Sequence, residues 1–149
     1  MDTTEILSIL YSEIHSVVVG MIDSKGHPSS AYLDVMLADD DSIFFMTSNN
    51  GRKLIKMLNN SDYISICGKT EGDFFHSKMI TIQGRIRNIG KARIDDLMDA
   101  NPYIKKLYPD DQKEKRQIID VFQVYCGVGV YQDFSVSPAE RIPFQFGRI

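Results

Sequence analysis

Alternating and clustered apolar residues predict six β-strands along the chain. The predicted strands are residues 16–22, 29–37, 43–46, 63–67, 78–89 and 122–131. The strand 78–89 is the clearest, because Ile80, Ile82 and Ile86 fall on one face of a period-two pattern with polar residues between them. Gly84 in its middle predicts a bulge or a close approach of another backbone. Residues 16–22 are apolar on both faces, which favours a strand covered on both sides.

Helical spacing predicts short helices between these strands. Asp2 to Glu5 resembles a capping box, and apolar residues continue a helix to about Glu13. Residues 52–58 and 92–98 have the same periodicity, and residues 103–108 and the start of 110–119 predict further helical turns. The tail from Pro138 onward is apolar enough to be expected to pack on the body or on a partner chain.

Short turns connect the first three predicted strands. Residues 23–28, with Gly26 and Pro28, and the acidic residues 38–41 predict two tight turns. These turns indicate a meander of three antiparallel strands. Six strands and a few short helices then favour a mainly β protein, a closed or nearly closed antiparallel barrel, with residues 1–149 forming one domain.

Composition narrows the possible functions. With 149 residues, 43% of them hydrophobic and 25% charged, the chain is typical of a globular protein. Its net charge of −3 argues against a nucleic-acid surface. Cys67 and Cys126 are expected to be buried thiols without a disulfide or metal role. The first residues lack a basic segment, and no apolar run reaches about 20 residues, so we expect a cytoplasmic protein.

One polar stretch combines residues that suit an anion. Thr47, Ser48 and two asparagines follow the predicted strand 43–46, and Arg52 and Lys53 open the next helix. Hydroxyls, free backbone N–H groups at a helix start and two cations together suit a phosphate group. The alternative is a solvated loop whose basic residues happen to fall at a helix start.

Other chemical motifs are missing from the sequence. It contains no G-x-G-x-x-G, no complete P-loop, no H-E-x-x-H and no nucleophile elbow. His15, His27 and His76 show no metal-ligand spacing, and a structural role is expected for each because no paired carboxylate or cysteine supports a ligand role. The sequence therefore assigns no metal site and no catalytic residue.

The order of these motifs resembles the pyridoxamine 5′-phosphate oxidase-like family of FMN-binding split barrels. The similarity extends over roughly residues 15–90. It comprises a strand leading into Asp23-x-x-Gly26-x-Pro28, the strand beginning Ser29, an acidic turn, an apolar strand ending in Met46-Thr47, the run Gly51-Arg52-Lys53, and a later strand with Gln83-Gly84-Arg85. The implied fold is a six-stranded antiparallel split β-barrel.

This resemblance implies a homodimer with two FMN sites at the subunit interface. By position, Arg52 and Lys53 would hold the FMN phosphate, with the hydroxyls of Thr47 and Ser48 nearby. Met46 would lie close to the flavin, and Ala31, Tyr32 and Leu33 would lie along its ring, partly through backbone groups. The partner chain would supply the remaining contacts.

The tail departs from true pyridoxamine phosphate oxidases. Residues 139–147 contain no Arg-x-His substrate motif, and no basic residue stands at Ala31 or Met36. The chain is more similar to the broader branch that includes nitroimidazole-resistance (Nim-type) proteins and flavin reductases. We therefore expect an FMN-dependent oxidoreductase acting on a small acceptor such as a nitro compound or a quinone. The alternatives are a non-catalytic flavin- or haem-binding barrel and a pyridoxamine 5′-phosphate oxidase.

Overall fold

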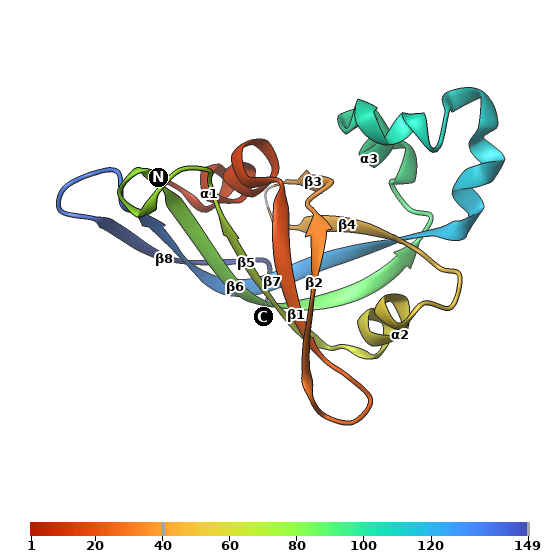
Figure 1. The fold of residues 1–149 in the computed structure, drawn as a ribbon, viewed down its shortest axis with the longest axis horizontal. Coiled ribbons are helices and arrows are strands. Elements are labelled where there is room, and N and C mark those ends of the chain that lie inside the picture. Colours follow the sequence, from red (N-terminus) through yellow and green to blue (C-terminus); the bar gives the residue numbers. More distant parts are fainter. Residues whose placement is uncertain (40, 149) are drawn as a thin grey trace.

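The computed structural model of the protein describes residues 1–39 and 41–148, which form one eight-stranded antiparallel sheet (Figure 1). Its strands are β1 (Ser16–Ile22), β2 (Pro28–Asp34), β3 (Leu37–Ala38), β4 (Ile43–Ser48), β5 (Tyr63–Lys69), β6 (Lys78–Gly90), β7 (Ile119–Asp133) and β8 (Glu140–Phe146). The strand order is β2-β1-β5-β6-β7-β4-β3, and β8 pairs with β7 beside β4.

Helical segments connect these strands. They are the α-helices α1 (Thr3–Ile9), α2 (Lys53–Asn60) and α3 (Ile94–Ala100), a π-helical turn η1 (Leu10–Ile14), and the 3₁₀ segments η2 (Phe74–His76), η3 (Pro102–Lys106) and η4 (Asp110–Ile118). The predicted cap of the first helix is confirmed, because Asp2 Oδ1 accepts a hydrogen bond of 2.9 Å from the backbone N–H of Glu5.

The sheet curls around a large apolar core, and a second, smaller cluster consists of Met36, Phe44, Leu97 and Val121. This arrangement confirms the mainly β split-barrel fold class. The first and last strands of the order, β2 and β3, are not paired to each other, so the barrel stays open on that side. Inward residues of β1, β5 and β6 meet the apolar faces of α1 and α2 in the core. Figure 1 shows α1 and α2 at different ends of the curled sheet.

All six predicted strands are present, and two more join them. The predicted tail forms β8, whose Phe146 is buried against the core, so the expectation that it packs on the body is confirmed. The alternation along β6 is also confirmed, with Ile80, Ile82 and Ile86 buried. Gly84 lies where a Cβ would approach Val124 Cγ1 to 2.7 Å, and the register with β7 shifts just after Arg85.

Two predictions about the first strands are wrong. The strand predicted over 29–37 ends at Asp34, because Val35 and Met36 are both buried and break the alternation. The backbone N–H of Val35 instead bonds the carbonyl of His15. The three-stranded meander is absent from the described residues, since β4 pairs with β7 and not with β2. The predicted acidic turn includes Asp40, which lies outside the described residues.

Residues on the outer face of the sheet are less buried within one chain than the sequence predicted. Val18 and Gly20 of β1 are only half-buried, so this strand is not covered on both sides within the chain. Cys126 is buried as expected, but Cys67 is exposed because β5 alternates and places it outward. Over the described ranges, no helix is both long and apolar enough to cross a membrane.

Candidate functional site

The passage from β4 to α2 brings free backbone donors to the start of a helix. Gly51 has φ of +83°, a left-handed conformation that glycine adopts readily. Arg52 then occupies the N-cap position, where its side chain accepts no hydrogen bond, and the first turn of α2 contains no acidic residue. The first backbone N–H groups of a helix have no partner within the helix. The start of α2 is therefore an uncapped, electropositive end.

Two exposed cations stand at this helix start, and a buried hydroxyl stands at the end of the preceding strand. Arg52 and Lys53 are exposed, and neither forms an ion pair within residues 1–39 and 41–148. Ser48 Oγ, at the end of β4, is buried and has no hydrogen-bond partner among those residues. Two free cations and an unpartnered hydroxyl are the groups that an oxyanion would satisfy.

Lys53 also faces the turn between β1 and β2. It lines a cleft of about 430 Å³ together with Asp23 and Ser24 of that turn and with residues of α2. Hydrogen bonds from the backbone N–H groups of His27 and Lys25 lower the pKa of Asp23, and the charge of Lys53 lowers it further. The cleft thus has one cationic wall and one anionic wall.

The predicted residues of β4 line a separate pocket. Met46, Thr47 and Ser48 surround a space of about 160 Å³ together with residues that follow α3. The opposite wall consists of Ile104, Leu107, Tyr108 and Ile119. The segment 102–108 was not among the predicted site residues, because neither its helical spacing nor its composition signals proximity to β4.

The predicted residues of β2 do not share one surface. Ala31 and Leu33 are half-buried against the core, whereas Tyr32 points to the outer face with 79% of its surface exposed. Successive residues of a strand face opposite ways, so only alternate members of this run can contact one side of a ligand. The cleft at Lys53 and the pocket at Met46 to Ser48 do not include these three residues.

Two strand edges next to these residues are not paired with another strand. β2 pairs only with β1, so its other edge is open. β4 pairs with β7 along its whole length but with β3 only at Ile43 and Phe44, which leaves the edge of Phe45 to Ser48 open. Open edges present unpaired backbone N–H and C=O groups to a ligand or to a partner chain. β2 and β4 also approach each other.

A hydrogen-bonded cluster lies directly after the predicted residues of β2. The hydroxyl of Tyr103 in η3 donates to Asp34 Oδ2 over 2.7 Å and lies 2.9 Å from His15 Nε2. Burial and the bond to Asp34 raise the pKa of Tyr103. Because Ile104 follows Tyr103 and lines the β4 pocket, this cluster fixes the pocket wall.

The histidines differ in part from expectation. His27 is exposed, as is usual for a residue in a turn with glycine and proline. His15 and His76 each have a carboxylate neighbour, which the sequence did not reveal: Asp34 lies 3.8 Å from His15, and Asp73 lies 2.6 Å from His76. No group of three or more potential metal ligands occurs in the described part of the chain.

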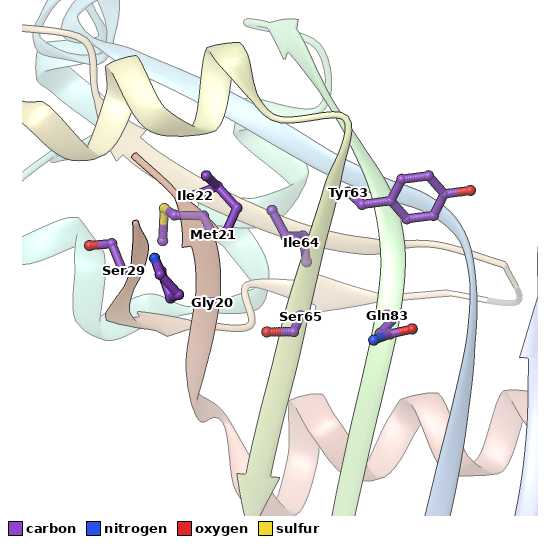
Figure 2. Close-up of a pocket in the computed structure, with 9 residues that line it drawn as sticks. Gly20, Met21, Ile22, Ser29, Tyr63, Ile64, Ser65 and Gln83 are labelled. Carbon is purple, nitrogen blue, oxygen red and sulfur yellow. The ribbon is translucent and has the colours of Figure 1, made fainter. Parts of the chain in front are cut away.

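The outer face of the sheet carries two rows of residues without a charge. Each row crosses β2, β1, β5, β6, β7 and β8 in that order. The first row consists of Tyr32, Val18, Cys67, Thr81, Val130 and Pro143. The second consists of Ser30, Gly20, Ser65, Gln83, Val128 and Gln145. We call these twelve residues the uncharged face. Two hollows of about 360 and 400 Å³ meet there at Ser65 and Gln83. Figure 2 shows the first, with Gly20 and Ser65 between Ser29 and Gln83.

Solved structures share this architecture. A NimC/NimA family protein from Clostridium acetobutylicum matches with a TM-score of 0.70 and 16% identity, over 94% of this chain and 90% of that chain. A pyridoxamine 5′-phosphate oxidase-related, FMN-binding protein from Nostoc punctiforme matches with a TM-score of 0.58 and 11% identity, over 97% and 91%. The chain has the split-barrel fold.

The same fold also occurs in a heme-binding protein. This protein, from Mycobacterium smegmatis, matches with a TM-score of 0.69 and 13% identity over 95% of this chain and 58% of that longer chain. No family model and no curated protein matches the sequence. The predicted resemblance to the split barrels is confirmed for the fold, and the bound group has to be argued from the site.

We predict that Tyr103→Phe loosens the wall of the β4 pocket. The variant loses the hydroxyl that bonds Asp34 and His15, which should lower the free energy of unfolding by about 1 kcal/mol in urea denaturation. Tyr108→Phe is the matched control, since the Tyr108 hydroxyl forms no hydrogen bond to the described residues. Equal stability of the two variants would show that the cluster does not hold the wall.

Proposed function

We propose that this chain binds FMN and uses it as an oxidoreductase. The observation that carries the proposal is the uncapped start of α2, where Arg52 and Lys53 have no ion pair within the described residues. Ser48 Oγ, at the end of the preceding strand, has no hydrogen-bond partner among those residues. A phosphate monoester would neutralise both cations and satisfy free N–H donors at once. The groups present therefore fit the phosphate end of FMN.

The neighbouring strands suit the flavin end of the cofactor. The open edges of β2 and β4 offer backbone donors and acceptors from Ala31 to Leu33 and from Met46 to Ser48. Apolar side chains such as Met46 and Leu33 offer a surface for a flat ring. In this proposal Thr47 and Ser48 lie near the phosphate. Met46 and the open backbone edge of Ala31, Tyr32 and Leu33 lie along the ring.

Bound FMN supplies hydride and electron transfer, and the protein supplies orientation and electrostatics. The role of this chain is to bind the phosphate, hold the ring and shield one side of it with residues 102–108. A small organic acceptor such as a nitro compound or a quinone fits the modest space beside Met46. Similar structures described as NimC/NimA family and as a putative 5-nitroimidazole resistance protein support this acceptor class.

Haem is the second candidate, because one solved neighbour is described as heme-binding and another as a heme storage protein. The hydrogen bond from His76 Nδ1 to Asp73 leaves Nε2 free, an arrangement common in metal-ligating histidines. However, the side chain of His76 is 75% exposed on a surface turn. The cationic start of α2 favours FMN.

We also propose that the protein is a homodimer that meets its partner through the uncharged face. Isologous interfaces bury apolar and neutral residues at their centre, and charged residues are depleted there. Tyr32 lies on this face with most of its surface exposed and belongs to the strand proposed to flank the flavin. A partner on this face would therefore border the cofactor.

Replacement of Lys53 by alanine should weaken FMN binding by roughly 10- to 100-fold, because a charge-assisted bond to phosphate is lost. Riboflavin, which lacks the phosphate, should bind both proteins almost equally. Both affinities can be measured by quenching of flavin fluorescence. Lys115→Ala removes one exposed charge from η4 and is the control. Equal losses for the two flavins would exclude Lys53 as the phosphate ligand.

A charge placed on the uncharged face should break the dimer. Thr81→Lys puts a cation at the centre of that face on each subunit, and burying two unpaired like charges is unfavourable. Sedimentation equilibrium should report a dimer for the wild type and a monomer for this variant. Gln117→Lys, on exposed η4 outside the face, should stay dimeric. A wild-type monomer, or a dimeric Thr81→Lys, would contradict the proposed interface.

The FMN-loaded protein should oxidise NADH or NADPH when a nitroaromatic compound or a quinone is the acceptor. Steady-state absorbance at the nicotinamide band measures this turnover, and free FMN at the same concentration is the control. Tight FMN binding without turnover above that control for any donor would instead identify a non-catalytic flavin-binding module.

A further inference from the structure

Asp120 is a shielded carboxylate at the beginning of β7, directly opposite Thr47 of β4. Its side chain is 19% exposed, and both of its oxygens are occupied. Oδ1 accepts hydrogen bonds of 3.1 Å from Asn49 Nδ2 and from Lys91 Nζ, and Oδ2 accepts one of 2.9 Å from Asn88 Nδ2. Three side chains, one from the β4–α2 loop and two from the end of β6 and the turn after it, thus converge on one anion.

These contacts reach both ends of the segment that carries Arg52 and Lys53. Asn49 begins the loop between β4 and α2, and its backbone N–H also donates to the carbonyl of Ile118 over 2.7 Å. At the other end, Asn88 Nδ2 donates to Asn59 Oδ1 in the last turn of α2 over 2.8 Å. Asn88 therefore links Asn59 directly to Asp120.

Asp120 remains an anion in this setting. Its burial raises the pKa, but hydrogen bonds from Asn88 and Asn49 and the charge of Lys91 outweigh burial and lower the pKa of Asp120 overall. An ionised carboxylate accepts on both oxygens, whereas a side-chain amide would present a donor to partners that are themselves donors. The convergence of Asn49, Asn88 and Lys91 therefore requires a carboxylate at this position.

The loop that Asp120 holds has few other anchors. Asn49, Asn50, Gly51 and Arg52 are all exposed, so packing against the core does not determine their position. The hydrogen bonds of Asn49 are the fixed point of this loop. Hydrogen bonds that fix the backbone of a loop also determine where its other side chains point, here those of Arg52 and Lys53.

We propose that Asp120 is a positioning residue for the cofactor phosphate, acting through Asn49 and Asn59 on the segment that carries Arg52 and Lys53. The proposal rests on the proposed FMN function and deepens it. It explains the preference for FMN over riboflavin by a carboxylate that does not contact the cofactor. Asp120 does not touch the phosphate. Its removal should therefore reduce the preference for FMN and spare the binding of the flavin ring.

The test compares the FMN and riboflavin affinities of the full chain carrying Asp120→Asn. FMN binding should weaken roughly tenfold, the scale of one hydrogen bond to a charged group, while riboflavin binding should change little. Asp133→Asn is the matched control, since Asp133 lies at the other end of β7 and is also hydrogen-bonded, to Ser135. Its ratio of FMN to riboflavin affinity should equal that of the wild type.

A double-mutant cycle separates positioning from general damage. If Asp120 acts through Lys53, Asp120→Asn should weaken FMN binding much less in the Lys53→Ala background than in the wild type. Asn49→Ala removes the side-chain hydrogen bond between the loop and Asp120, and it should also reduce the preference for FMN over riboflavin. This variant provides the test if Asp120→Asn does not fold.

The outcomes distinguish this inference from the proposed function. A wild type that binds no FMN overturns the proposed function itself. In a second outcome, the wild type prefers FMN over riboflavin while Asp120→Asn or Asn49→Ala keeps the same ratio of the two affinities. That result overturns the positioning role alone. Equal weakening of FMN and riboflavin would also overturn it, because it would show a general structural effect.

Discussion

The fold depends on one long strand that hydrogen-bonds with three others. β7 pairs with β6 along most of its length, with β4 over its first half and with β8 over its second half. Gly127 lies where the pairing of β7 changes from β4 to β8. It is so close to β6 that a Cβ at this position would approach Gln83 O to 2.7 Å. Because β4 is attached to the sheet mainly through β7, the position of the β4–α2 loop follows from this pairing.

This arrangement explains why the candidate site lies at an opening of the barrel. β4 leaves β7 at Ser48, and its other edge meets only the two residues of β3. β2, at the far end of the strand order, is also open on one side. The two open edges and the uncapped start of α2 therefore present unpaired backbone groups and cations, with few side-chain contacts of their own. Such a site suits a cofactor with a flat ring at one end and a phosphate at the other.

Much of this structure could be predicted from the sequence, because strand alternation is a local property. The pattern of Ile80, Ile82 and Ile86 identified the inner face of β6, and Asp2 with Glu5 identified the first cap. Pairing between distant strands could not be derived, so the meander of the first three strands was wrong. The exposure of Cys67 was also missed, because burial of an outward residue depends on what covers the sheet.

Some features of the candidate site could also be inferred from the sequence. Arg52 and Lys53 were found because cations at a helix start are unusual, and the structure places them at an uncapped helix end. Asp120 and Tyr103 left no signal in the sequence, since each acts through residues far away in the chain. The resemblance placed Ala31, Tyr32 and Leu33 along one ligand partly through backbone groups, and it did not reveal that the pleat turns the Tyr32 side chain to the opposite side from its two neighbours.

The absorption spectrum of the purified protein, recorded before and after addition of FMN and then of haem, tests the central claim most directly. The account predicts the two visible bands of an oxidised flavin, carried through gel filtration with the protein and released as free FMN on denaturation. A colourless protein that retains no added FMN, or one that develops a Soret band with haem and leaves FMN unbound, would contradict it.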